Sequence, residues 1–241
     1  MGKNPAKKAK QAPPLSADRL RAGWQGPAGT RIHLARPQDA AAADALMATT
    51  GEEMRFTSVL RRAIEDGSAS STMVAGIGGE NAYREAAVHT FSTLTLDRAS
   101  TTVCLTLVAT DEHDCVVGVL SGTAPGTIMS MAASNGYSPA QARVLSLVIA
   151  KVHGLAVAEH TRGQGIATAL LKRAWQVYQQ LGYLLLYGSY EADRDLTAFY
   201  TRSGYTVHAP GALLSLERLS LPFRVGAGPD ECLFTRWRPR R

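Results

Sequence analysis

A long apolar stretch at residues 144–157 runs directly into a glycine-containing turn, and an amphipathic segment follows at once. The stretch is rich in Val, Leu and Ile, which is typical of a central strand buried on both faces. Segment 165–181 repeats its apolar residues at helical spacing, and Gly182 marks its end. The sequence therefore predicts a buried strand, a tight turn and a helix in direct succession, within a mixed α/β fold.

The turn at residues 162–168 has the chemistry of an anion-binding site. Gly163 and Gly165 lack a Cβ atom, so the backbone can come close to a ligand. The first N–H groups of a helix have no partner within the helix, and the helix dipole adds partial positive charge there. A pyrophosphate group is a ligand that such a turn fits.

Two common phosphate-binding motifs do not match this turn. The P-loop pattern GxxxxGK[ST] is absent. The dinucleotide pattern GxGxx[GA] would place Thr168 where its third small residue belongs, and that turn is normally the first strand–helix turn of its domain. Here the turn comes late in the chain.

The run RGQGIA at 162–167 instead resembles the [RQ]xxGx[GA] pyrophosphate turn of the GNAT superfamily of N-acetyltransferases. The run LAV at 155–157 resembles the strand before that turn. Residues 193–205 resemble the family's next helix, whose usual form is N-x-x-A-x-x-[LF]-Y-x-x-x-G-[FY]. Residues 31–39 and 102–121 are similar, more weakly, to its opening strand and its hairpin.

The resemblance implies a fold, a cosubstrate and a reaction. The fold would be a mixed, mostly antiparallel twisted sheet, splayed at its centre, with helices on both faces. Acetyl-CoA would lie between strands 150–157 and 183–187. The reaction would be the transfer of an acetyl group from acetyl-CoA to a primary amine, by direct attack in a ternary complex. The acceptor, either a small molecule or a protein amine, is not assigned.

The resemblance also assigns the residues that contact the cofactor. They are Leu155, Ala156, Val157, Arg162, Gly163, Gln164, Gly165, Ile166, Ala167, Thr168 and Asp193. Asp193 replaces the usual asparagine, which contacts the pantetheine arm in relatives, and a carboxylate cannot donate the hydrogen bonds of an amide.

Tyr200 is the candidate general acid, because the family places a tyrosine here, near the cofactor sulfur. A phenol can protonate a departing thiolate. The alternative is a core aromatic packing beside Phe199, although adjacent helical residues do not share one face.

His153 is the candidate general base. Strand alternation predicts that it shares a face with Leu155 and Val157. Some relatives carry a histidine at this position, and an imidazole with a pKa near 6.5 suits proton abstraction. The alternative is a buried neutral histidine bonded to a backbone carbonyl. Lys151 stands where other relatives have a glutamate. Glu159, His160 and Glu191 are weaker candidates for the base.

The formal net charge of +6 is concentrated at the two ends of the chain. Residues 1–22 carry +5 and residues 236–241 carry +4, which leaves −3 for the rest. A basic tail can bind nucleic acid non-specifically. No aromatic residue stands among Lys3, Lys7, Lys8 and Lys10 to stack on bases, so a solvated tail is favoured. The alternative function is a non-catalytic CoA-binding sensor or partner-binding module, whose basic tail docks on nucleic acid.

The predicted organisation is a disordered basic tail at 1–28 and one acyltransferase domain at 29–241, with insertions near 67–100, 122–142 and 209–230. No transmembrane segment or secretory signal is predicted, so a cytoplasmic location is expected. Cys104, Cys115 and Cys232 are expected to be buried free thiols in a reducing compartment. No metal site is predicted, and the oligomeric state is left open.

The remaining pattern predicts further elements. Helices are expected at 40–47, 52–65, 80–91 and 193–203, with a loop at 67–81. Strands are expected at 31–35, 102–110, 115–121, 183–187, 205–208 and 232–237, and a short helix is expected to begin at Ser138-Pro139.

Overall fold

The computed structural model describes residues 14–239, and within them eight strands form one mixed sheet in the order β1-β2-β3-β4-β5-β6-β10-β7. A separate two-stranded sheet pairs β8 with β9. The strands are β1 (Trp24–Gln25), β2 (Arg31–Leu34), β3 (Leu105–Thr110), β4 (Val116–Thr123), β5 (Ile149–Val157), β6 (Leu185–Glu191), β7 (Thr206–Val207), β8 (Leu213–Ser215), β9 (Arg224–Gly226) and β10 (Glu231–Trp237).

The described helices comprise α-helices and short 3₁₀ turns. The α-helices are α1 (Ala17–Ala22), α2 (Ala40–Ala48), α3 (Ser58–Glu65), α4 (Ser71–Ala75), α5 (Glu80–Thr93), α6 (Leu96–Thr102), α7 (Gly126–Ser134), α8 (Pro139–Leu145), α9 (Ile166–Gln180) and α10 (Thr197–Arg202). The 3₁₀ turns are η1 (Pro37–Asp39), η2 (Glu52–Met54), η3 (Glu159–Thr161), η4 (Ala192–Arg194) and η5 (Glu217–Leu219).

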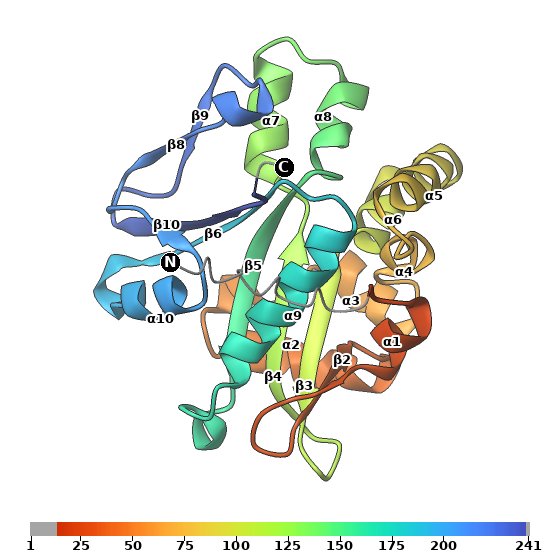
Figure 1. Ribbon diagram of the computed structural model, residues 1–241, viewed down its shortest axis with the longest axis vertical. Helices are drawn as coiled ribbons and strands as arrows, with labels where there is room; N and C mark the ends of the chain where they lie inside the picture. Colours follow the sequence, from red (N-terminus) through yellow and green to blue (C-terminus); the bar gives the residue numbers. More distant parts are fainter. Residues whose placement is uncertain (1–13, 240–241) are drawn as a thin grey trace, which may run out of the picture.

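The sheet opens at its centre, between β5 and β6. These two strands are parallel and pair only over Ile149–Lys151 and Leu185–Tyr187. Their neighbours pair over longer, antiparallel stretches, β4 with β5 on one side and β6 with β10 on the other. The sheet therefore splits into two halves beyond Lys151, as Figure 1 shows where β6 and β10 diverge from β5. This confirms the predicted mixed, mostly antiparallel sheet splayed at its centre.

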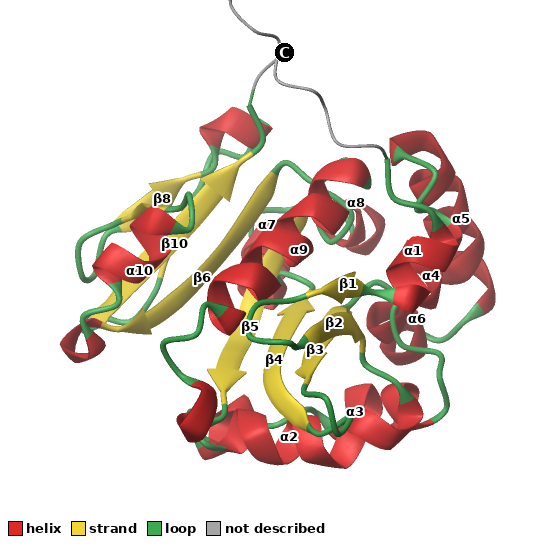
Figure 2. Ribbon diagram, turned by 60° about the horizontal axis from the view of Figure 1, so that its bottom comes forward, coloured by secondary structure: helices red, strands yellow, loops and turns green. Residues whose placement is uncertain are grey.

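Helices cover both faces of the half that runs from β1 to β5. Helix α9 packs on one face, where Leu170 and Leu171 join a buried cluster with Leu107 and Leu120. Helices α2 and α3 cover the other face, where Met47 packs in a cluster with residues such as Val108. Figure 2 shows the sheet between these two layers. A third buried cluster joins α7, α8, β8 and β9 to the N-terminal ends of β5 and β6.

The prediction of a disordered segment through residue 28 is wrong for residues 14–28. Ser16 caps α1 by accepting a hydrogen bond from the backbone N–H of Arg19 at 3.1 Å. The side chains of Leu20 and Trp24 are buried in the α9 cluster. The Gln180 amide, at the end of α9, bonds both the N–H and the carbonyl of Leu15, at 2.6 and 2.7 Å. Glycines and prolines punctuate this segment, but its few apolar residues are enough to fix it. Residues 1–13 lie outside the described part of the chain.

Several other boundaries also differ from the prediction. The expected loop at 67–81 contains α4, and two segments for which no helix was predicted form α6 and α7. The expected helix at 52–65 is divided into η2 and α3, because Thr57 caps a new helix by accepting from the N–H of Leu60. The apolar run from 144 begins inside α8, and β5 starts only at Ile149.

The composition of β5 predicts burial on both faces along the whole strand, and this prediction is wrong. Its side chains alternate between buried and half-buried from Ala150 onward, because one edge of the strand borders the opening in the sheet. Helices α5 and α9, the β3–β4 hairpin and the Ser138 start of α8 all agree with the prediction. Ser138 and Gln141 form the reciprocal capping box expected of a Ser-Pro start.

Candidate active site

A pocket of about 350 Å³ occupies the opening between β5 and β6. One side is formed by β5 and by the turn after α2, and the other by β6, α10 and β10. The lining residues are Thr50, Glu53, Met54, Lys151, Val152, His153, Gly154, Leu155, Ser189, Tyr190, Glu191, Arg194, Leu196, Tyr200, Glu231 and Phe234. We call it the splay pocket. It brings both predicted catalytic residues, His153 and Tyr200, to one cavity.

The predicted pyrophosphate turn follows β5 and η3 and ends at α9. Gly163 and Gly165 have φ angles of +77° and +84°, a backbone conformation that favours glycine. Residues 162–165 are exposed, and no side chain caps α9. A Cβ atom at Gly163 would meet nothing within 4 Å. The turn therefore offers free N–H groups of a 15-residue helix and open space in front of them, which fits an anionic group such as a pyrophosphate.

The predicted cofactor residues do not all present side chains to a ligand. Leu155 lines the splay pocket, whereas Ala156 is buried on the opposite side, against α2. Ile166 is buried under the turn, and only the backbone of these two residues can face a cofactor. Gln164 and Thr168 are exposed on the turn and on the first turn of α9.

The flanks of the site also separate into residues that line it and residues that do not. The Val157 carbonyl accepts a hydrogen bond from Nε of Arg162 at 3.3 Å, which ties the turn to the strand end. Ala167 is half-buried. Asp193 is exposed in η4 and does not line the splay pocket. The wall from that segment is made by Arg194 and Leu196 instead.

Tyr200 is held by aromatic stacking. Its ring lies parallel to Phe234 with centroids 3.8 Å apart, and to Tyr190 with centroids 5.3 Å apart. The ring of Phe199 packs edge-on instead, and that residue is half-buried. Burial raises the pKa of Tyr200 above its usual value of 10.0, so the phenol stays protonated at neutral pH. Tyr200 therefore both packs in the core and lines the splay pocket.

A β-bulge in β5 decides which way His153 faces. Ser121 pairs with Gly154 and Gly122 pairs with Val152, so His153 is an extra residue in the register. Val152 and Leu155 consequently pack in the same cluster under α9, although three positions separate them. The predicted face shared by His153, Leu155 and Val157 is therefore wrong.

His153 faces the layer of α2 and α3. It lies beside Phe56 and Leu60, which belong to the cluster on that face. Burial lowers its pKa below 6.5, and the positive charge of Lys151 lowers it further. Contacts with the backbone of Met54 and Arg55, and the charge of Glu53, act in the opposite direction but are smaller. His153 is therefore neutral near pH 7 and able to accept a proton.

The splay pocket also contains Glu53 and Arg194, two charged residues that sequence patterns did not single out. Glu191 pairs with Arg194 at 2.7 Å, and Arg194 also donates to the carbonyl of Thr50 at 3.3 Å. Glu53 is exposed at the rim, on the turn between α2 and α3. No motif marks Glu53 or Arg194. Only the approach of the α2–α3 turn to the end of β6 brings these two residues together.

The weaker candidates for the general base also divide into residues that line the splay pocket and residues that do not. Glu159 and His160 are exposed in η3 and do not line the splay pocket, whereas Glu191 and Lys151 do. Cys104 and Cys232 are buried free thiols, but Cys115 is exposed, because the β3–β4 hairpin loop that contains it projects from the sheet. Burial raises the pKa of the Cys104 thiol to about 11.

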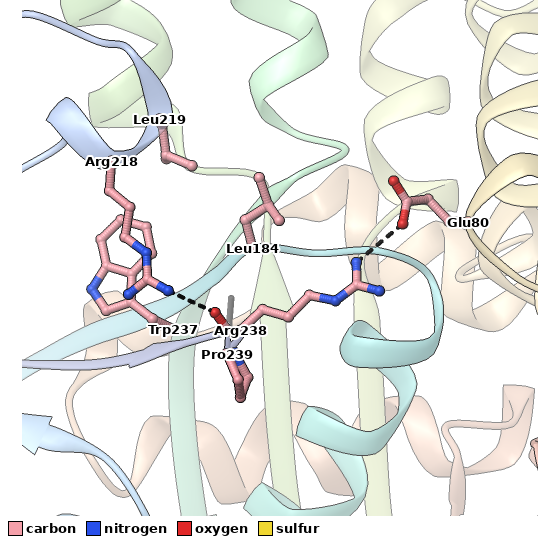
Figure 3. Close-up of a pocket in the computed structure, with 7 residues that line it drawn as sticks. All are labelled: Glu80, Leu184, Arg218, Leu219, Trp237, Arg238 and Pro239. Atoms are coloured by element: carbon pink, nitrogen blue, oxygen red, sulfur yellow. Dashed lines mark hydrogen bonds and ion pairs between the residues drawn. The ribbon is translucent and has the colours of Figure 1, made fainter. Parts of the chain in front are cut away.

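A second pocket lies at the opposite end of β6 and β10, as Figure 3 shows. Arg218 stacks over the Trp237 ring at 4.9 Å, and Arg238 pairs with Glu80 at 3.0 Å. This pocket is remote in the sheet from His153 and Tyr200, because it adjoins Leu184 before β6, whereas the splay pocket adjoins the other end of that strand.

Two structural features are absent from residues 14–239. No helix there is both long and apolar enough to cross a bilayer. No set of three or more His, Cys, Asp or Glu side chains in the same residues is grouped as metal ligands would be. The lysines of the predicted basic tail precede residue 14, so the tail's suggested role lies outside the described residues.

Residues 104–207 match the model described as the acetyltransferase (GNAT) domain, a stretch that runs from the start of β3 through the glycine turn and Tyr200 to β7. This stretch of the chain is similar to a GNAT acetyltransferase domain. The GNAT domain match includes both halves of the splayed sheet and the turn between them. A comparison with curated protein sequences finds no match.

Solved structures similar to this chain include several GNAT proteins. An acetyltransferase of the GNAT family from Streptococcus pneumoniae is 18% identical over 86% of this chain and 99% of its own, with a TM-score of 0.44. One from Staphylococcus aureus is 9% identical over 86% and 98%, with a TM-score of 0.47. An N-acetyltransferase of the family from Escherichia coli, in complex with CoA, is 22% identical over 76% and 72%, with a TM-score of 0.40.

Proposed function

We propose that this chain transfers an acetyl group from acetyl-CoA to a primary amine, by direct attack in a ternary complex. The observation that supports this most is the convergence of His153, Tyr200 and the open edge of β5 on one pocket, in a stretch that matches the GNAT domain model and includes the glycine turn. The turn would hold the diphosphate of the donor, and the splay pocket would receive its thioester.

The reaction needs a neutral amine and a proton for the leaving thiolate. The amine nitrogen attacks the thioester carbonyl carbon, the C–N bond forms and the C–S bond breaks. The nitrogen gives a proton to His153, directly or through water, and the thiolate takes a proton from Tyr200. The products are the N-acetyl amine and CoA with a free thiol.

The environments of the two residues suit these roles. A neutral His153 accepts a proton at pH 7 because burial and Lys151 lower its pKa. Tyr200 has a proton to give because burial raises its pKa. The thioester oxygen requires a donor as it gains charge. The backbone of β5 beyond Lys151 is the candidate, because its pairing with β6 ends there.

The test is release of free CoA thiol from acetyl-CoA in the presence of a primary amine, with mass detection of the acetylated product. We expect amine-dependent thiol release by the wild-type chain, and its loss in a His153→Ala, Tyr200→Phe double variant. Thiol release that does not depend on the amine, or that is unchanged in the double variant, would contradict the proposal.

A further inference from the structure

A second cavity, of about 430 Å³, lies on the other side of His153. It is bounded by α3 and by α6, a helix that the family pattern in the sequence did not include. We call it the α3–α6 pocket. Phe56, Val59 and Leu60 line one wall, and Ser100 and Cys104 line another. Its size falls within the range of small-molecule sites.

His153 joins the two cavities. Of the described residues, it alone lines both the splay pocket and the α3–α6 pocket. The bulge in β5 makes this possible, since it turns His153 toward α3 while Leu155 remains on the α9 side. A group that occupies the α3–α6 pocket therefore has the imidazole between itself and Tyr200.

The lining of the α3–α6 pocket indicates what fits it. Phe56, Leu60 and Cys104 are buried apolar side chains, and burial keeps the Cys104 thiol protonated. Asp97 is the one carboxylate among the lining residues, and it is exposed. Lysine and arginine are absent from the lining. The pocket thus matches an apolar body without a negative charge.

We propose that the α3–α6 pocket binds the apolar body of the acceptor, so that the acceptor is an amine with an alkyl or aryl group and no carboxylate on it. This rests on the proposed acetyl transfer and adds the class of acceptor. The acceptor's amine reaches past His153 to the thioester, which places the base between the two substrates. An acyl chain of the donor is uncharged, so Asp97 would not favour its binding in this pocket.

The experiment compares three amines with acetyl-CoA: hexylamine, ethylamine and 6-aminohexanoate. We expect kcat/KM for hexylamine to exceed that for ethylamine by about tenfold or more, because each buried methylene favours binding. We expect 6-aminohexanoate to be the poorer six-carbon substrate, and Asp97→Asn to narrow that difference. Glu85→Gln, at an exposed carboxylate of α5, is the control and should leave the comparison unchanged.

Two variants fill the pocket from different helices. Val59→Trp acts from α3 and Ser100→Phe from α6. Each should lower the ratio of kcat/KM for hexylamine to that for ethylamine toward one. Val88→Trp is the matched control, because Val88 is 69% exposed on α5 and does not line the pocket. A ratio that both filling variants leave unchanged overturns the proposal.

Two outcomes distinguish a failure of this proposal from a failure of the proposed acetyl transfer. If hexanoyl-CoA is the better donor and the filling variants abolish that preference, the pocket holds the donor's acyl chain and the proposal is overturned. If no amine is acetylated, the proposed function fails, and thermal unfolding with CoA and hexylamine decides the pocket alone. Stabilisation by hexylamine in the wild type but not in Val59→Trp supports binding there, and no stabilisation overturns it.

Discussion

The phenol ring of Tyr200 lies flat against the ring of Phe234, with centroids 3.8 Å apart and planes 13° from parallel. Tyr200 comes from α10 and Phe234 from β10, so the stack fixes a short helix on the outer half of the sheet. The same side chain lines the splay pocket. The ring and the hydroxyl of Tyr200 therefore have separable roles, in packing and in chemistry.

Tyr200→Phe should lower the turnover number about 100-fold, within the range for loss of a general acid, while leaving the unfolding midpoint and the KM for acetyl-CoA nearly unchanged. The stacking is retained and only the proton donor is lost. Tyr205→Phe is the matched control, because Tyr205 packs against Phe234 too but its hydroxyl is buried without a partner among the described residues. Equal rates for wild type and Tyr200→Phe would remove the phenol from the mechanism.

The rate of transfer should depend on pH through His153. The base must be neutral, and its pKa is lowered below 6.5 by burial and by Lys151. The neutral fraction of His153 therefore stays high at pH 7, and its contribution to kcat/KM is lost only as the pH drops through the lowered pKa. The measurement is the pH dependence of kcat/KM for the wild type and for His153→Gln with the same acceptor. The amine titrates equally in both, so a difference in the fall of kcat/KM at acid pH, the acid limb, is due to His153.

The control for that profile is His208→Gln. Burial lowers the pKa of His208 as well, but this residue bonds Thr235 at 3.0 Å and does not line the splay pocket. Its acid limb should coincide with that of the wild type. An acid limb that persists unchanged in His153→Gln would show that another group is the base.

Excess acetyl-CoA should raise the unfolding temperature by several degrees, because it binds only the folded chain. Gly163→Asp should abolish this shift, since it adds a carboxylate in front of free N–H groups. Gly136→Asp is the control: Gly136 also has a positive φ, of +84°, and open space around its Cβ position. Both variants carry the same strain, so a loss of binding confined to Gly163→Asp identifies the turn.

Leu20→Ala should lower the free energy of unfolding by about 2–5 kcal/mol, as expected for a fully buried leucine. Urea unfolding of this variant and of Arg21→Ala, whose side chain is 65% exposed, measures the difference. The same midpoint for Leu20→Ala and the wild type would mean that α1 does not pack on the domain.

The sequence predicted the elements whose signals are local. Gly163 and Gly165 mark the turn, and the apolar spacing of α9 marks the helix, so both appear in the structure where the pattern placed them. Tyr200 and His153 were identified through resemblance, and both line the splay pocket. Residues that are close in sequence are enough to predict features of this kind.

Features that depend on distant contacts were not predicted. The order at Leu15 depends on Gln180, 165 positions away. The direction in which His153 faces depends on how β5 pairs with β4 around it, which no periodicity within β5 reveals. Arg194 enters the pocket through its bond to Thr50, 144 positions earlier. In each case the partner is remote in sequence, so a local pattern carries no trace of it.

The bulge at His153 has a consequence for the comparison of related chains. If β5 alternated regularly through His153, with no bulge, Leu155 would lie on the face opposite to Val152 and would point at α2 instead of α9. A residue at or before position 153, counted back from the glycine turn, therefore corresponds between two related chains only when both contain the bulge or both lack it. An ungapped alignment across position 153 can match residues of the same type that act on opposite sides of the sheet.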